Sequence, residues 1–268
     1  MDTSPLLSDE AINYYQSQIS ILRWAIELGQ IDIDVDVALL SHYLVNPRQG
    51  HLEAVYHIYA YLKRHERCAM VFDDKTLHFA KADFPEFDWL DFYGDVTEAI
   101  PLNAPKPRGN PVQMTAFCDA DHARNLVTRR SHTGILIYLN QAPITWYSKA
   151  QKTVETSTFG SEFVALRIAV ELIEALQYKL CMMGVPLDGP TNLFGDNSSV
   201  ITNAIIPSST LKKKHNAICY HRVREAVAAK VVRIAHIPTG QNLADMFTKP
   251  LGGSKLHEFC KKILYQMG

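Results

Sequence analysis

The chain has 268 residues, of which 47% are hydrophobic and 21% charged, with 13 Gly and 13 Pro. This composition is typical of a globular protein with one or two cores, and it excludes low-complexity, collagen-like and wholly disordered chains. The longest apolar runs fall short of the ~18 residues of a membrane helix, and the first residues lack a signal-peptide pattern. Five scattered cysteines without a Cys-x-x-Cys pair favour a reducing compartment over a disulfide framework or a cysteine-rich zinc site.

The net charge of −1 conceals an uneven distribution along the chain. Residues 1–105 contain 7 Lys and Arg against 17 Asp and Glu, whereas residues 106–268 contain 20 against 11. Two parts with different roles are therefore expected, and the basic part suits a polyanionic partner. A basic face that is simply solvated is the commoner explanation of such a bias.

The first part is predicted to be a small helical bundle over residues 1–72, with nothing catalytic in it. Apolar residues recur at helical spacing in three segments, which are 8–29, 34–46 and 50–64. Residues 73–112 follow, and five Pro and Gly residues fall within 101–111. Because proline at that density does not fit inside a helix or sheet, we expect an extended linker over 73–112.

The second part alternates between strand-like and helix-like patterns. Apolar, β-prone runs predict strands at 112–118, 133–139, 143–147, 192–195 and 231–236. The two runs that flank Asn140 and Gln141 predict a hairpin. Helical spacing predicts helices at 158–183, 197–204, 218–229 and 243–248. This order predicts an α/β domain over 113–252, with a mixed sheet flanked by helices, followed by a C-terminal helix or tail at 253–268.

Four carboxylates of the second part fall where such a sheet would bring them together. Asp119 and Asp196 follow strands, Glu162 lies in the first turns of the long helix, and Asp245 lies on the last helix. Clustered carboxylates repel one another, so they require a cation, and hard oxygen ligands favour Mg²⁺ or Mn²⁺. Two such ions hydrolyse phosphodiesters. Taken singly, each acid is more simply a turn former, a helix cap or a first-turn acid.

Several motifs of the second part resemble, in order, the ribonuclease H domain of copia-type LTR retrotransposon polyproteins. They are FCDADHA, TRRSHTG, ITWYSKAQKTVETSTFGSEFVAL, LFGDNSSV, KKKHNAICYHRVREAV and HIPTGQNLADMFTKPL, and together they span about residues 115–252. The stretch VALLSHYLVNPRQGHLEAVYHIYAYLKRH in the first part is similar to the end of reverse transcriptase, which precedes that domain in those polyproteins.

This resemblance implies a ribonuclease H-like fold and hydrolysis of the RNA strand of an RNA–DNA hybrid, leaving 5′-phosphate and 3′-hydroxyl ends. It also implies that Asp119, Glu162, Asp196 and Asp245 are the catalytic residues and hold two Mg²⁺ ions, or Mn²⁺. Many relatives of the fold carry a histidine on a loop shortly before the final aspartate. The loop here has none, which leaves the role of His236 open.

Asp121 is a weaker competitor for the position of Asp119. We expect alternation along the strand to turn its side chain away from the cluster.

Substrate contacts are predicted in three places. Arg129 and Arg130 in the loop before the predicted hairpin suit phosphate groups, as does the basic run Lys212, Lys213, Lys214 and His215.

Asn197 and Ser198, next to Asp196, suit a ribose 2′-hydroxyl, the group that distinguishes RNA from DNA. The competing explanation for Asn197 and Ser198 is that they cap a helix. The competing explanation for the basic residues above is that they are simply solvated at the surface.

The preferred interpretation is a metal-dependent endoribonuclease that acts on RNA–DNA hybrids, with upstream reverse-transcriptase domains as partners if the chain is part of a polyprotein. A catalytically silent nucleic-acid-binding remnant is the alternative, and a structural module with a docking bundle is a third. No membrane association is expected. The resemblance implies an intracellular location, in the cytoplasm within virus-like particles or in the nucleus.

Overall fold

The computed structural model describes residues 2–66, 68–211 and 214–266, and the chain divides into two compact units. The first unit combines Met1–Val71 with Lys249–Gly268, and the second is Phe72–Thr248. These boundaries differ from those predicted, because the C-terminal segment belongs with the first unit and the predicted linker belongs with the second. Among the described residues, none of the helices has the length and hydropathy needed to span a membrane.

The first unit is built from helices that fall where the apolar spacing predicts them. The helices are α1 (Asp9–Glu27), α2 (Asp34–Leu40), α3 (Gln49–Arg64) and α8 (Gly253–Ile263), with short 3₁₀ turns η1 (Ile31–Ile33) and η2 (Ser41–Tyr43). Ser8 begins α1, since its hydroxyl accepts a hydrogen bond from the Ala11 amide. The predicted stripe of α1 supplies the core, with Tyr15, Ile19 and Leu22 fully or almost fully buried.

A two-stranded antiparallel sheet in the first unit was not predicted. It pairs β1 (Cys68–Met70) with β7 (Leu264–Gln266). Strands of this length leave no periodic pattern in a sequence. The preceding α8 buries Phe259 and Ile263, so the end of the chain contributes to the core of the first unit.

The second unit contains the mixed sheet. Its strands are β2 (Met114–Asp121), β3 (His132–Leu139), β4 (Ala142–Ala150), β5 (Thr191–Gly195) and β6 (Val232–His236). They lie in the order β4-β3-β2-β5-β6, in which β2, β3 and β4 are antiparallel neighbours, while β5 runs parallel to both β2 and β6. The predicted mixed sheet is confirmed, and its topology is ribonuclease H-like.

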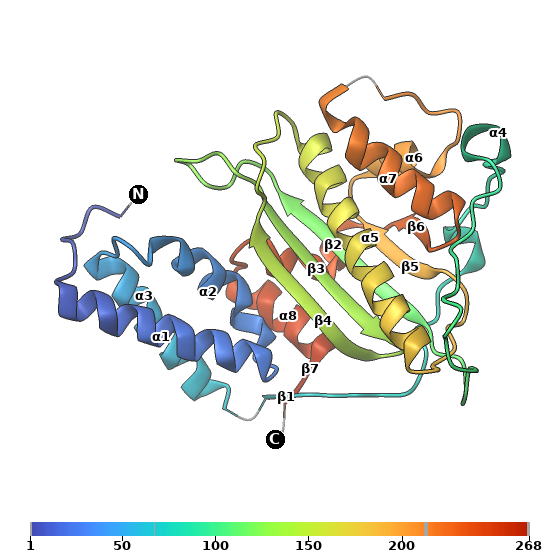
Figure 1. Ribbon diagram of the computed structural model, residues 1–268. Helices are drawn as coiled ribbons and strands as arrows, with labels where there is room; N and C mark the ends of the chain where they lie inside the picture. The colour runs from blue at the N-terminus through green and yellow to red at the C-terminus, as the bar shows by residue number, and fades with distance from the viewer. Residues whose placement is uncertain (1, 67, 212–213, 267–268) are drawn as a thin grey trace. The chain divides into compact units, whose positions relative to one another are not determined.

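Helices flank this sheet as predicted. The predicted ones are α5 (Thr158–Met182), α6 (Ser198–Ile205) and α7 (Ala217–Ala228), whereas the short helix α4 (Leu90–Tyr93) lies in the segment predicted to be a linker. The 3₁₀ turns are η3 (Lys81–Asp83), η4 (Lys214–Asn216), η5 (Thr239–Gln241) and η6 (Leu243–Phe247). The long helix α5 lies across one face of the sheet (Figure 1), and its Phe163, Leu166 and Val170 join Ile135 of β3 in the main core. The helix predicted at 243–248 is instead the 3₁₀ turn η6.

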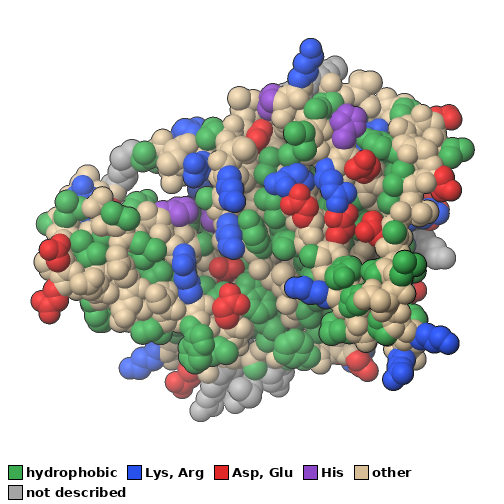
Figure 2. Space-filling model, in the orientation of Figure 1, with side chains coloured by type: hydrophobic (Ala, Val, Ile, Leu, Met, Phe, Trp, Pro, Cys, Tyr) green, Lys and Arg blue, Asp and Glu red, His purple; other side chains and the backbone are tan. Residues whose placement is uncertain are grey.

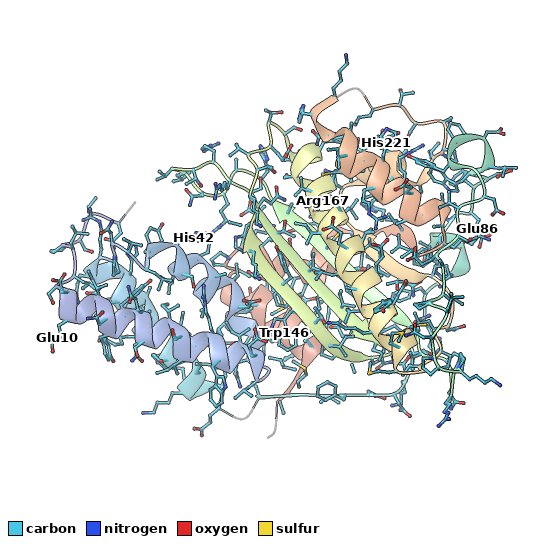
Figure 3. The ribbon with its side chains drawn as sticks, viewed as in Figure 1. Glu10, His42, Glu86, Trp146, Arg167 and His221 are labelled. Carbon is cyan, nitrogen blue, oxygen red and sulfur yellow. The ribbon has the colours of Figure 1, made fainter. Side chains whose placement is uncertain are left out.

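The connecting segment 72–112 is irregular in structure but packs against the second unit. The Phe84 ring lies 5.4 Å from that of Phe194 on β5. The Tyr93 hydroxyl lies 2.8 Å from Nδ1 of His221 on α7, which Figure 3 labels. Aromatic burial therefore attaches the predicted linker to the sheet and to α7.

Candidate active site

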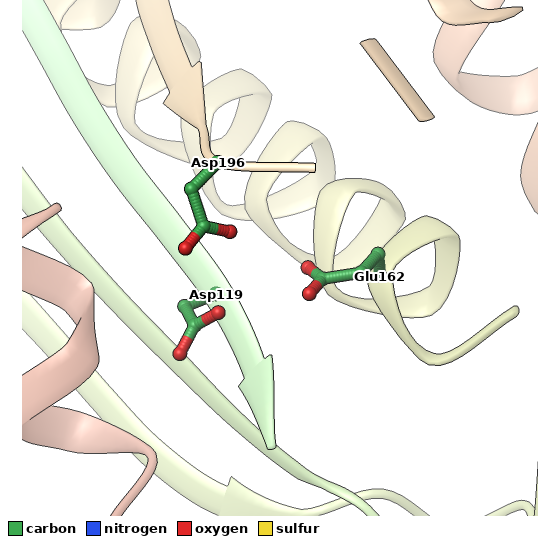
Figure 4. Close-up of side chains that lie close together, drawn as sticks. All are labelled: Asp119, Glu162 and Asp196. Atoms are coloured by element: carbon green, nitrogen blue, oxygen red, sulfur yellow. The ribbon is translucent and has the colours of Figure 1, made fainter. Parts of the chain in front are cut away.

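Three of the four predicted carboxylates gather at one edge of the sheet. Asp119 lies in β2, Asp196 follows the last residue of β5, and Glu162 lies in the second turn of α5. Each offers an oxygen within 4.8 Å of those of the other two. Figure 4 shows the three side chains pointing toward one another across the gap between the two strands and the helix.

The strand register explains why Asp119 and Asp196 lie side by side. Phe117 on β2 pairs with Phe194 on the parallel strand β5, and each aspartate lies two residues further along its own strand. The two carboxylates therefore leave the sheet at the same level. Ser157 caps α5, accepting a hydrogen bond from the Gly160 amide, and so fixes the turn that carries Glu162.

The three converging carboxylates are largely shielded from solvent. Asp119 is 4% exposed and Glu162 is 9% exposed, whereas Asp196 is half-buried and forms the open side of the group. Burial, and then the negative charges of Glu162, Asp119 and Asp196, raise the pKa of the neighbouring Cys118 thiol well above its ordinary value. The edge of the sheet is thus a strongly negative site in a poorly hydrated setting.

The donor set of this group fits a divalent cation. Carboxylate oxygens are the hard ligands that Mg²⁺ and Mn²⁺ prefer, and the three that converge are too close for unscreened charges to be stable together. A cation held by Asp119, Glu162 and Asp196 would offset that repulsion.

Asp245 is fully buried but lies outside the three-carboxylate group. Its segment η6 packs on the backbone of β3, where a Cβ added to Gly134 would lie 2.6 Å from the Ala244 carbonyl oxygen. Gly134 precedes the core residue Ile135, so η6 covers the face of the sheet opposite α5. Asp119 pairs with Gly134 across β2 and β3, so its side chain points to this same face, where the Thr248 hydroxyl after η6 donates to its Oδ2. Asp245 therefore lies in a segment that packs beside Asp119, and its role as a fourth ligand stays a prediction.

Asp121 is also outside the group, although the expected reason was wrong. Side chains alternate with a period of two along a strand, so Asp121 and Asp119 share a face of β2. Asp121 is instead engaged by Arg124, with 2.8 Å between Oδ2 and Nη1.

His236 ends β6 and is exposed, and its Nε2 lies 3.1 Å from the carbonyl oxygen of Asp196. The structure therefore places this histidine beside the site.

The predicted ribose contacts occupy the start of α6. Asn197 is the N-cap of that helix, and its Oδ1 accepts a hydrogen bond from the Val200 amide at 3.2 Å. Ser198 is the first helical residue. Capping thus engages the Asn197 oxygen, and the ribose contact of the two residues stays a prediction.

The predicted phosphate contacts are exposed. Arg129 and Arg130 lie in the loop between β2 and β3. Lys214 and His215 lie in η4, where His215 Nε2 is 3.8 Å from a Glu155 carboxylate oxygen. Lys212 and Lys213 lie outside the residues that the structure describes.

The outer surface of α5 and α7 has mixed charge. Figure 2 shows Lys and Arg side chains beside Asp and Glu side chains on this surface. The pairs include Arg167 with Glu171 and Arg222 with Glu174. A surface of this kind does not favour a polyanion.

Two positioning residues were not predicted. The Thr248 hydroxyl lies 2.7 Å from Asp119 Oδ2, and the Asn242 side-chain amide donates to the Cys118 carbonyl oxygen at 2.9 Å. Both hold η6 against β2. Their only signal in the sequence is that they flank Asp245 in the motif QNLADMFT.

No protein-family model matches the chain. The chain is 31% identical over 156 residues to the retrovirus-related Pol polyprotein from transposon RE2 of Arabidopsis thaliana, which covers 58% of this chain and 11% of that protein. It is 27% identical over 250 residues to the Pol polyprotein from transposon TNT 1-94 of Nicotiana tabacum, covering 93% of this chain and 16% of that one. The chain therefore spans only a small part of these relatives' length.

Among solved structures, the chain is similar to LC11-RNase H1 in complex with an RNA/DNA hybrid. The TM-score is 0.41 and the identity 16%, over 50% of this chain and 93% of that one. The similarity to retrotransposon polyproteins that the motifs indicated is confirmed.

Proposed function

We propose that the second unit is a divalent-metal-dependent endonuclease that hydrolyses the RNA strand of RNA–DNA hybrids, as part of a copia-type retrotransposon polyprotein. The observation that carries the proposal is the convergence of Asp119, Glu162 and Asp196 at one edge of a ribonuclease H-like sheet. The similarity to transposon Pol polyproteins supports the same conclusion. A hybrid substrate, two Mg²⁺ ions and upstream reverse-transcriptase domains all belong to this proposal.

The residues of the site have distinct roles in it. Asp119, Glu162 and Asp196 would hold the metal, with Asp245, buried in η6, as a further ligand. Divalent ions in such a site acidify a water and stabilise the charge that develops on the phosphate oxygens. Asp196, half-buried at the open side, is the carboxylate nearest to incoming substrate. Asn197 and Ser198 would contact the ribose, and the exposed basic residues would contact phosphates.

The test is incubation of the purified chain with a hybrid labelled on its RNA strand, in Mg²⁺. We expect RNA cleavage with 5′-phosphate products and no cleavage of duplex DNA. Asp196→Asn should abolish cleavage while hybrid binding, measured in Ca²⁺, persists. Asp188→Asn is the matched control, because Asp188 is an exposed carboxylate three residues before β5, at the strand end away from Asp196. Binding without cleavage by the unmutated chain would establish the silent remnant instead.

A further inference from the structure

The loop that joins β2 to β3 (residues 122–131) is held in a defined conformation by its own hydrogen bonds. Asn125 Oδ1 accepts from the amides of Val127 at 3.0 Å and Thr128 at 2.8 Å. Across the loop, the Arg129 amide donates to the Asn125 carbonyl at 2.7 Å. Figure 1 shows this loop projecting beyond the end of the sheet. The projection is therefore a shaped element whose tip has a fixed orientation.

The tip of this loop presents two adjacent apolar side chains to solvent. Leu126 is 67% exposed and Val127 is 71% exposed. Single exposed apolar residues are ordinary on protein surfaces. Here two neighbours stand together at the end of a hydrogen-bonded projection, where they cannot pack on their own domain. They are suited to contact a partner.

The surroundings of the tip favour a polyanionic partner. Residues 122–131 contain three arginines and no acidic residue. Arg124 is engaged with Asp121, which leaves Arg129 and Arg130 exposed beside the apolar pair. Phosphate contacts by such residues give affinity without sequence preference. An apolar tip with flanking arginines matches how proteins engage a groove and its phosphate borders.

The loop also continues the strand that carries a metal-site carboxylate. Asp119 lies in β2, and His122, which begins the loop, is three residues further on. At a rise of about 3.3 Å per residue, the base of the loop lies about 10 Å from Asp119 along the strand. A duplex bound at the carboxylate edge would therefore extend past the loop.

We propose that Leu126 and Val127 form an apolar contact with the shallow minor groove of the bound RNA–DNA hybrid, adjacent to the strand being cut. This inference rests on the proposed function and names a substrate-positioning element for it. The minor groove of an A-form-like duplex is wide and shallow and exposes the sugars. Apolar side chains can cover those sugars without reading the bases, so the contact is independent of sequence.

The experiment uses the full chain with the paired substitution Leu126→Ser and Val127→Ser. Hybrid binding in Ca²⁺ should weaken about 10-fold, because the apolar area of both side chains is no longer covered. In Mg²⁺, KM should rise by a similar factor with kcat nearly unchanged, since uniform binding is lost. The slope of binding against salt should stay the same, because no charge has been removed. Leu102→Ser, at a still more exposed leucine of the connecting segment, is the control and should change none of these quantities.

The outcomes separate this inference from the proposed function. If the unmutated chain cuts the hybrid and the Kd of the paired variant for the hybrid is within twofold of that of the unmutated chain, the tip contact is wrong and the nuclease proposal stands. If the unmutated chain binds the hybrid without cutting and the paired variant binds about 10-fold more weakly, the contact stands and the nuclease proposal fails. A second pair, Leu126→Ala and Val127→Ala, repeats the comparison if the serine variant fails to fold.

Discussion

The Thr248 hydroxyl lies 2.7 Å from Asp119 Oδ2, joining residues that are 129 positions apart in the chain. Thr248 follows η6 directly, and its hydroxyl also lies 3.1 Å from the Asp245 carbonyl oxygen. One side chain thus links a carboxylate of the candidate metal site to η6, the segment that carries Asp245. Hydrogen bonds of this kind orient metal-binding carboxylates.

Thr248→Val should weaken Mg²⁺ binding. Valine has the shape of threonine but cannot donate to Asp119, so the carboxylate loses its orientation. We expect the Mg²⁺ concentration for half-maximal cleavage to rise about 10- to 100-fold. Thr248→Ser retains the hydroxyl and should remain close to the unmutated chain. An unchanged Mg²⁺ requirement in the valine variant would exclude this role.

Glu162→Gln should separate metal binding from folding. Without metal, removing one of three converging charges should leave the Tm unchanged or raise it. With Mg²⁺ at 100 times its Kd, the unmutated chain should gain about 2.7 kcal/mol, and the variant should gain much less. Thermal unfolding with and without Mg²⁺ measures both effects. Asp188→Asn is the control, and an equal Mg²⁺ response in both variants would contradict the site.

Gly134→Ala should destabilise the second unit. A Cβ at this position would lie 2.6 Å from the Ala244 carbonyl oxygen and 2.9 Å from the Phe247 Cβ. Because the obstacles include backbone, η6 must move away from β3, at a cost of about 1–3 kcal/mol. Chemical denaturation gives the free energy of unfolding. Gly240→Ala, where a Cβ meets nothing within 4 Å, should cost far less.

Arg224→Lys should be costly although it conserves charge. Arg224 is 2% exposed, and its guanidinium lies over the Trp89 ring of the connecting segment. It also donates to the Ser209 hydroxyl and to the carbonyl oxygens of Asn203, Ile206 and Pro207. A lysine ammonium cannot donate to all of these oxygens at once, so we expect the free energy of unfolding to fall by about 2–3 kcal/mol.

The same substitution on the surface of the same helix provides the comparison. Arg222 is a partly exposed partner of Glu174, so Arg222→Lys should cost less than about 1 kcal/mol. Urea unfolding of the two variants tests the difference, and equal losses would show that the buried network contributes little.

Asp32 should make the stability of the first unit depend on pH. Burial raises the pKa of Asp32 above 3.8, against the opposing hydrogen bond from the Tyr61 hydroxyl, which lies 2.6 Å from Oδ2. The folded state then holds the proton more tightly than the unfolded state. The contribution of protonated Asp32 to the free energy of unfolding is therefore complete below about pH 3.8. It is lost as the pH rises through the pKa of Asp32 in the folded state.

Asp32→Asn should remove that loss. The difference in free energy of unfolding between the Asp32→Asn variant and the unmutated chain should shift in favour of the variant as the pH rises from 3.8 to neutrality. The protein is equilibrated in urea at each pH, and a hydrogen-exchange pulse at one fixed pH then labels the amides of α3. Because α3 belongs to the first unit, this labelling reports the unfolding of that unit alone. Parallel pH profiles for the two proteins would contradict the shift.

Local patterns were sufficient to predict much of the second unit. The runs flanking Asn140 and Gln141 predicted a hairpin, and β3 and β4 form it, with Asn140 at a φ of 55°. The strand–helix–strand order placed Asp119, Glu162 and Asp196 at one edge, because parallel neighbours end together.

What could not be predicted depends on contacts between distant segments. The place of Asp245 could not be predicted, because residues 243–247 form a 3₁₀ turn whose position depends on the fit of η6 against Gly134 of β3. The packing of 72–112 depends on aromatic partners such as Phe194, whose position only the folded sheet defines.

The division of the chain has a consequence for its synthesis. The first unit begins with the N-terminal helices but includes α8 and β7, and the whole of Phe72–Thr248 is inserted between these parts. A ribosome therefore releases the sheet complete while the earlier helices still lack Phe259 and Ile263 of their core. The N-terminal helices are made before the sheet but complete their core only after it, and a stop codon placed just after Thr248 would leave that core permanently incomplete.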